Sequence, residues 1–174
     1  VNASKNDISF FNSLKYLEIL KKTNAKFVIT SSKYGKIVSK YSNPILVDHV
    51  LKSVSLISGL FYPKSLDDAV DLNVKKPDQK YFKKVQFGFN VLIGNNVKIG
   101  INSIIGHNTI IESNVIIGTN SIIGNNVLIK NSIIGNNVRI LDGAVLGKKG
   151  FGFLPDKKKN KRYPHIGMVL IKDN

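Results

Sequence analysis

The 174-residue sequence predicts a two-part chain, a mixed α/β segment followed by a solenoid of short parallel strands. Residues 1–80 mix short helical and strand-like apolar patterns. Isoleucine then recurs every six residues, a period that fits neither an α-helix nor a plain strand. Since 43% of the residues are apolar, the chain can bury a core in both parts.

Apolar spacing predicts the first elements of the α/β segment. Leucines and Ile19 form one apolar stripe over 13–23 with lysines opposite, which indicates a helix. The β-branched KFVIT at 26–30 indicates a strand, and GKIVSKY at 35–41 indicates a second one.

A longer helix is expected to begin near Pro44, because Ser42 or Asn43 can cap it and proline suits a first helical turn. It should extend to about Leu60. Prolines and charges make 62–78 a linker. We therefore expect domains at 1–64 and 87–174, joined by a linker and entry segment at 65–86.

The hexads predict their own geometry. In the first six hexads glycine follows the isoleucine five times, and asparagine lies three residues after it in all six. Asparagine tolerates the left-handed backbone of a tight corner, and glycine permits close approach. Isoleucine should then point inward, with three faces in an 18-residue coil and about three coils in all. The isoleucines are Ile93, Ile99, Ile105, Ile111, Ile117, Ile123 and Ile129.

The hexad spacing is interrupted twice. Ile134 follows Ile129 by five residues instead of six, which we interpret as one tightened corner. After Leu146 the repeat stops, and 147–167 is predicted to be a loop insertion. The final MVLIKDN then resembles the start of another face.

Composition narrows the function classes. The net charge of +15 comes mostly from lysine, and we favour a lysine bias on solvated faces over nucleic-acid binding, since arginine clusters are missing. No apolar run is long enough to cross a bilayer. The absence of cysteine excludes disulfides and cysteine-based metal sites.

Three further motifs, in order along the chain, point to one protein family. They are NDISFFNSLKY at 6–16, SNPILVDHVLKSV at 42–54, and GAVLGKKGFGF at 143–153 followed by YPHIG. Together with the hexads they resemble the UDP-3-O-acylglucosamine N-acyltransferases, hexapeptide-repeat enzymes of lipid A biosynthesis. The resemblance implies an α/β N-terminal uridine-binding domain, partial here, followed by a left-handed parallel β-helix.

The resemblance also implies an activity and partners. The family transfers a 3-hydroxyacyl chain from the phosphopantetheine of acyl carrier protein to the 2-amino group of a UDP-linked acylglucosamine. It implies a cytoplasmic homotrimer with no further cofactor, no metal, no nucleic acid and no transmembrane segment. Acyl-chain length is not readable from these residues.

The same resemblance implies binding residues. Phe10 and Tyr16 match the aromatic pair that sandwiches the uracil, and Ser13 stands where the family has a hydrogen-bonding asparagine. Stacking on a base suits both rings, although both could instead be core residues. The loop residues Gly150, Phe151, Gly152, Phe153 and His165 are expected to line the substrate cleft.

His107, in IGHN, resembles the family's catalytic Ile-Ala-His-Asn hexad, but it precedes the Gly-Phe-Gly-Phe loop, whereas the family's base follows it. His107 also occupies a position where neighbouring hexads vary freely, which we interpret as a tolerant solvent-facing corner. We therefore expect the base beyond Asn174 and no activity from this segment alone. A zinc site from His49, His107 and His165 is disfavoured, because only one of them lies in the repeat.

Two alternatives remain open at this point. One is another hexapeptide-repeat sugar O- or N-acyltransferase with its own N-terminal domain. The other is a non-catalytic repeat scaffold. An internal fragment would also expose a last coil with unpaired backbone groups, so we expect the isolated segment to be marginally stable or to associate.

Overall fold

The computed structural model describes residues 3–66, 69–155 and 160–174. The chain forms two compact units, one of residues 1–67 with 151–164, the other of 68–150 with 165–174. The described residues 151–155 and 160–164, which the sequence placed within the repeat domain's loop, thus group with the first unit. Part of the basic run at 157–162 lies outside the described residues.

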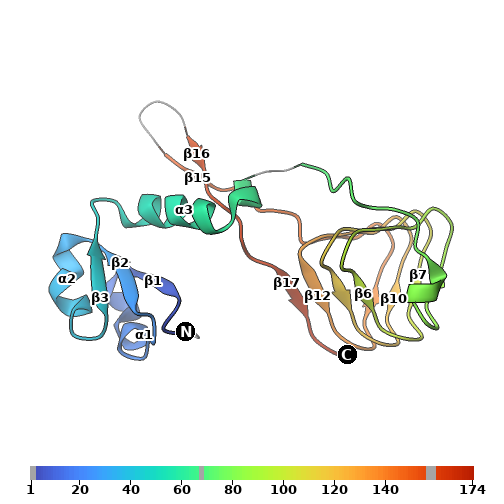
Figure 1. Cartoon of the computed structure of the whole chain (residues 1–174), viewed down its shortest axis with the longest axis horizontal. Helices are drawn as coiled ribbons and strands as arrows, with labels where there is room; N and C mark the ends of the chain where they lie inside the picture. The colour runs from blue at the N-terminus through green and yellow to red at the C-terminus, as the bar shows by residue number, and fades with distance from the viewer. Residues whose placement is uncertain (1–2, 67–68, 156–159) are drawn as a thin grey trace. The chain divides into compact units, whose positions relative to one another are not determined.

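The first unit is built on a three-stranded parallel sheet in the order β1-β2-β3 (Figure 1). Phe11, Val28 and Val38 are almost fully buried, and Leu20 and Ala25 complete this core. Burial of these side chains from strands and helices holds the unit together. Its elements are β1 (Ile8–Phe11), the 3₁₀ turn η1 (Leu14–Tyr16), α1 (Leu17–Lys21), β2 (Phe27–Thr30), α2 (Ser32–Val38), β3 (Asn43–Leu46), α3 (Val50–Phe61) and the 3₁₀ turn η2 (Pro63–Leu66).

The first predictions for this unit are partly confirmed. The helix expected over 13–23 is present as η1 followed by α1, and β2 is the strand expected at 26–30. The strand expected at 35–41 is wrong, because α2 occupies most of it. Tyr34, Ile37 and Val38 recur at helical spacing and pack together on the core, and this periodicity outweighs the β-branched composition.

The predicted start of the long helix is also wrong. Pro44 lies in the edge strand β3, and α3 begins only at Val50. The Asn43 and Val47 N–H groups donate to Lys26 and Thr30, so alternation along the strand turns position 44 away from β2. Proline, which lacks an N–H, is compatible with that free side of an edge strand.

The second unit is a parallel β-helix of three sheets, each with four strands (Figure 1). The hexads predicted about three coils, and β4 before the first isoleucine together with β17 after the loop brings every sheet to four strands. The final segment is thus a further face, as expected. The sheets are β4 (Gln86–Phe87), β7 (Ile104–Ile105), β10 (Ile122–Ile123) and β13 (Arg139–Ile140); β5 (Leu92–Ile93), β8 (Ile110–Ile111), β11 (Leu128–Ile129) and β14 (Val145–Leu146); β6 (Lys98–Ile99), β9 (Ile116–Ile117), β12 (Ser132–Ile134) and β17 (Val169–Ile171). A 3₁₀ turn, η3 (Gln79–Tyr81), precedes β4, and β15 (Phe153–Leu154) pairs with β16 (Lys161–Arg162).

The roles predicted for the hexad residues are confirmed. The repeat isoleucines stack inward, with Ile105, Ile111 and Ile129 fully buried. Each corner asparagine from Asn90 to Asn137 has a positive φ, the left-handed conformation that asparagine tolerates. The asparagine side chains also bond along the solenoid axis, for example Asn90 to Asn108 at 3.2 Å.

The shortened spacing changes the register by one residue. Ile111 pairs with Ile129, 18 residues on, whereas Ile117 pairs with Ile134, 17 residues on. The missing residue lies in the corner after β11, where Asn131 takes the left-handed conformation only two residues after Ile129. The solenoid therefore continues in register with one corner shortened.

Stacking of the inward isoleucines predicts a sharp contrast between neighbours. Ile105→Ala should lower the free energy of unfolding by about 2–5 kcal/mol, because it leaves a cavity in the core. Ile104→Ala, at an outward position that is 39% exposed, should lower it by about 1 kcal/mol or less. Urea unfolding followed by circular dichroism measures both, and equal losses would contradict the inward stacking.

Candidate functional site

The candidate uridine residues lie on β1 and on the η1 turn that follows its carboxyl end. Phe10 is in β1 and 47% exposed, while its neighbour Phe11 is buried in the core. Tyr16, in η1, is also 47% exposed, so neither candidate ring is a core residue. Crevices at the carboxyl ends of parallel strands are common ligand sites.

Ser13 initiates the turn that carries Tyr16. Its hydroxyl oxygen accepts a hydrogen bond from the Lys15 N–H at 3.3 Å, as an N-cap does. One hydroxyl lone pair is therefore used locally, and the hydroxyl proton remains able to donate. Asn12, beside it, is half-buried.

The candidate cleft-loop residues form two separate contacts. At the base of the loop, the Gly150 N–H donates to His165 Nδ1 at 3.1 Å. Further out, the rings of Phe151 and Phe153 meet edge to face at 4.7 Å between centroids. Phe151 is 87% exposed, which leaves a large apolar surface available to another molecule.

His107 is engaged by its own scaffold. Its Nδ1 accepts a hydrogen bond from the Phe89 N–H at 2.9 Å, and its ring stacks on the Phe89 ring at 5.5 Å. The His107 N–H in turn donates to Asn125 Oδ1 at 2.8 Å. Nδ1 is therefore the hydrogen-bond acceptor of this ring.

The corner position, two residues after each inward isoleucine or its equivalent, follows a rule that sequence reasoning missed. At six such corners the side chain accepts a hydrogen bond from the backbone N–H at the same corner of the preceding coil, whereas the Thr119 hydroxyl donates to Asn136 Oδ1. The corner is solvent-facing at His107, as expected, and most of the later residues at this position also share an acceptor atom. The bonds are Phe89 N to His107 Nδ1, His107 N to Asn125 Oδ1, Asn125 N to Asp142 Oδ1, Asn95 N to Ser113 Oγ, Thr119 N to Asn136 Oδ1 and Asn136 N to Asp173 Oδ1.

The residue types that depart from this pattern at the corner position lie in the first coil. Phe89 and Ile101 occupy the corner position there, and neither side chain can accept a hydrogen bond. The strands that precede them, β4 and β6, are edge strands of their sheets, so no described coil before them offers an N–H. The recurrence of residues with acceptor side chains at the later corners was the sequence signal that this position bonds to the preceding coil.

A pocket of about 290 Å³ opens beside the shortened corner. The described residues around it offer hydroxyl, amide and apolar groups but no ionisable side chain, so they can bind a ligand without transferring a proton. The lining is Ser113, Asn114, Ile116, Asn131, Ser132, Ile133, Ile166, Gly167 and Met168.

Within residues 3–66, 69–155 and 160–174, no three histidine, cysteine or carboxylate side chains come together as metal ligands would. Among these same residues, no helix has the length and apolar character needed to span a membrane.

The acceptor role of His107 gives a direct test. The free energy of unfolding of His107→Asn should exceed that of His107→Ala by about 1 kcal/mol. The asparagine amide oxygen can replace Nδ1 as the acceptor, as it does at Asn125. Both variants remove the ring contact with Phe89, so their difference reports the hydrogen bond alone. Urea unfolding measures it, and identical free energies for the two variants would refute the acceptor role.

Comparison with known proteins identifies the repeat. Residues 90–125 match the family model of the bacterial transferase hexapeptide, six repeats long. The matched residues run from the corner after β4 to that after β10, where the inward isoleucines and left-handed asparagines are most regular.

Similarity to curated proteins extends over both units. The chain is 36% identical to UDP-3-O-acylglucosamine N-acyltransferase of Helicobacter pylori (strain ATCC 700392 / 26695), over 99% of this chain and 51% of the relative. It is 40% identical to UDP-3-O-acylglucosamine N-acyltransferase 2 of Legionella pneumophila (strain Paris), over 97% of this chain and 50% of the relative. The chain thus spans about half the length of these relatives. The chain is therefore similar to UDP-3-O-acylglucosamine N-acyltransferases over both units, and its parallel β-helix carries the bacterial transferase hexapeptide repeat.

Proposed function

We propose that this chain is part of an N-acyltransferase that moves a 3-hydroxyacyl chain from acyl carrier protein to the 2-amino group of UDP-3-O-acylglucosamine. The observation that carries the proposal is the extent of the similarity. Relatives bearing this name match 97–99% of the chain, so the match includes the α/β unit as well as the hexapeptide repeat. Another hexapeptide transferase would need to share only the repeat.

In this proposal the α/β unit holds the nucleotide. The half-exposed rings of Phe10 and Tyr16 take the two faces of the uracil, a stacking that needs little more than two flat apolar surfaces. The hydroxyl of Ser13 donates a hydrogen bond to a uracil oxygen while its oxygen remains the cap of η1.

The chemistry needs a base near the attacking amine, because the nitrogen must lose a proton as it attacks the acyl thioester. We do not assign this role to His107, whose Nδ1 is bonded to the Phe89 N–H and whose ring is stacked on Phe89. The loop residues Phe151, Phe153 and His165 are proposed to line the cleft for the sugar.

The proposal includes assembly and partners. Three outward residues, Ile104 on β7, Ile116 on β9 and Leu170 on β17, are 37–62% exposed. They offer apolar surface to other copies in a homotrimer. The net charge of +15 favours an acidic acyl carrier protein as donor. We place the reaction in the cytoplasm.

The nucleotide-binding part of the proposal can be tested in this chain. Isothermal titration calorimetry with UDP should show binding. Phe10→Ala or Tyr16→Ala should weaken the affinity about tenfold or more, since base stacking contributes about 1–3 kcal/mol. Phe27→Ala is the matched control, because Phe27 is an exposed aromatic residue at the opposite end of the same sheet.

Two outcomes would contradict the proposal. A folded chain without affinity for UDP would favour a hexapeptide transferase with a different donor or acceptor. Equal weakening by Phe10→Ala and Phe27→Ala would mean that the α/β unit as a whole, and not this pair of rings, governs binding.

A further inference from the structure

The shortened corner after β11 lacks the residue whose side chain would accept a hydrogen bond from the preceding coil. The corner after β8 consists of Glu112, Ser113 and Asn114, whereas the corner after β11 passes directly from Lys130 to the left-handed Asn131. The residue missing from the third coil is therefore the one at the corner position. The Ser113 N–H accordingly loses the acceptor that a regular third coil would supply.

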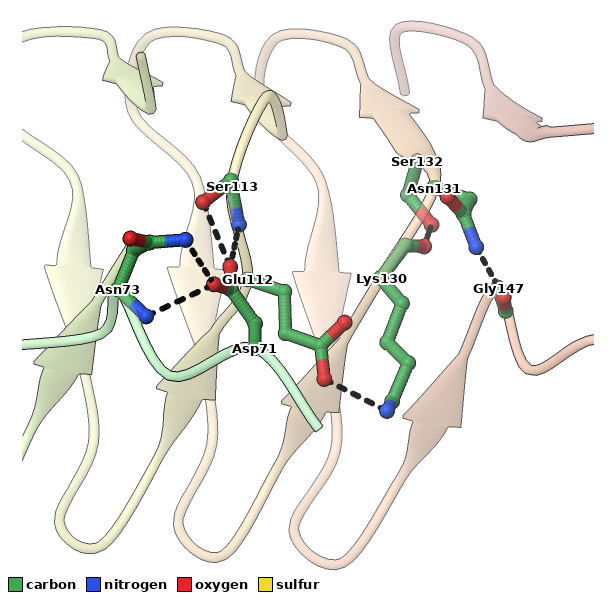
Figure 2. Close-up of polar contacts among 8 residues, drawn as sticks. All are labelled: Asp71, Asn73, Glu112, Ser113, Lys130, Asn131, Ser132 and Gly147. Atoms are coloured by element: carbon green, nitrogen blue, oxygen red, sulfur yellow. Dashed lines mark hydrogen bonds and ion pairs between the residues drawn. The ribbon is translucent and has the colours of Figure 1, made fainter. Parts of the chain in front are cut away.

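Asp71 lies where that acceptor is missing (Figure 2). The Ser113 N–H donates to Asp71 Oδ2 at 2.8 Å, the same length as the His107 N–H to Asn125 Oδ1 bond at a regular corner. The Ser113 hydroxyl donates to the same oxygen at 2.6 Å. A side chain 42 residues earlier in the chain thus makes the bond that the next coil makes elsewhere.

Asp71 belongs to a strap, which we define as residues 70–75. Lys75 pairs with Ile93 of the edge strand β5 through two backbone hydrogen bonds of 2.8 and 3.0 Å. Val70 and Leu72 are 70% and 88% exposed, so apolar burial of these side chains does not hold the strap. The two bonds from Ser113 to Asp71 join it to the second coil.

The carboxylate is arranged for this role. Asn73 donates to Asp71 Oδ1 from its backbone N–H at 2.9 Å and from Nδ2 at 3.0 Å, which orients the group (Figure 2). The neighbouring charges, Glu112 and Lys130, are paired with each other at 2.6 Å. Hydrogen bonds from the Ser113 side chain, the Ser113 backbone and Asn73 hold the pKa of Asp71 well below its usual range.

We propose that Asp71 replaces the corner residue that the solenoid lacks in its third coil, and that this contact fastens the strap across the first two coils. The strap is then a latch built into the fold: the solenoid is complete at this corner only while the strap is closed. This inference is independent of the proposed function, because it depends only on contacts within the second unit.

Hydrogen exchange of single amides, resolved by NMR, tests the latch. Asp71→Ala should speed exchange at the Ser113 amide about tenfold or more, because the N–H loses its acceptor. The Asn125 amide, which donates to Asp142 at 2.7 Å, is the internal control and should change less than about twofold. Asp71→Asn retains an acceptor oxygen and should give an intermediate effect at Ser113.

Two results would overturn the latch. Unchanged exchange at Ser113 in the Asp71→Ala variant would show that the carboxylate does not protect this amide. Equal acceleration at Ser113 and Asn125 would show that the variant destabilises the whole solenoid and not this corner.

The pH dependence of stability gives a second test. Because the folded pKa of Asp71 lies below its unfolded value of about 3.9, the stabilisation is fully present above about pH 5 and is lost as the pH falls through the folded pKa. The urea midpoint of the wild type should therefore exceed that of Asp71→Asn at pH 7, and the difference should shrink by pH 3. The other carboxylates are present in both proteins and cancel. Equal midpoints at pH 7, or a difference unchanged at pH 3, would overturn the latch.

Discussion

The solenoid depends on how closely its coils approach one another at the corners. A Cβ atom added at Gly94 would lie 2.3 Å from the Ser113 nitrogen, and one added at Gly118 would lie 2.5 Å from the Gly135 carbonyl carbon. Neither contact is possible for a real side chain, so glycine is a steric requirement at these positions. The close approach in turn lets inward isoleucines of successive coils stack without voids, as the full burial of Ile105 and Ile123 indicates.

Close approach also decides which polar residues the solenoid tolerates. Backbone groups between tightly stacked coils must find partners within the protein, because water has limited access to them. Inside the coil, Ser103 and Thr109 serve this need by donating to the carbonyls of Gly118 and Gly124. At the corners, side-chain acceptors of the following coil serve it, and His107 is one of them. A histidine at such a corner therefore has a structural reason to be there.

The repeat was predictable from sequence, whereas much of the α/β unit was not. Steric and conformational demands recur with every hexad, so glycine and asparagine report them directly. In the α/β unit, α2 was mistaken for a strand because Ile37 and Val38 are β-branched, and only the spacing to Tyr34 indicates its helical packing. Pro44 was equally ambiguous, since the start of a helix and the free side of an edge strand both accommodate it. The candidate uridine residues came from a resemblance alone. Asp71 gave no sequence signal, because its partner Ser113 is distant along the chain and the contact exists only in the folded solenoid.

The missing corner residue after Lys130 explains two other features of this corner, Glu112 in place of glycine and the contact made by Asp71. Glu112 and Lys130 replace glycine at consecutive coils of one corner, and the corner residue after Lys130 is missing. Wherever glycine is retained between Gly94 and Gly135 in the repeat, the atoms that an added Cβ would strike include those of the corner residue in the following coil. Glu112 has no such residue above it, so its side chain fits and pairs with Lys130, with both groups about four-fifths buried. The deletion that removes the steric demand also removes an acceptor, and for this reason the same corner requires a carboxylate from outside the solenoid.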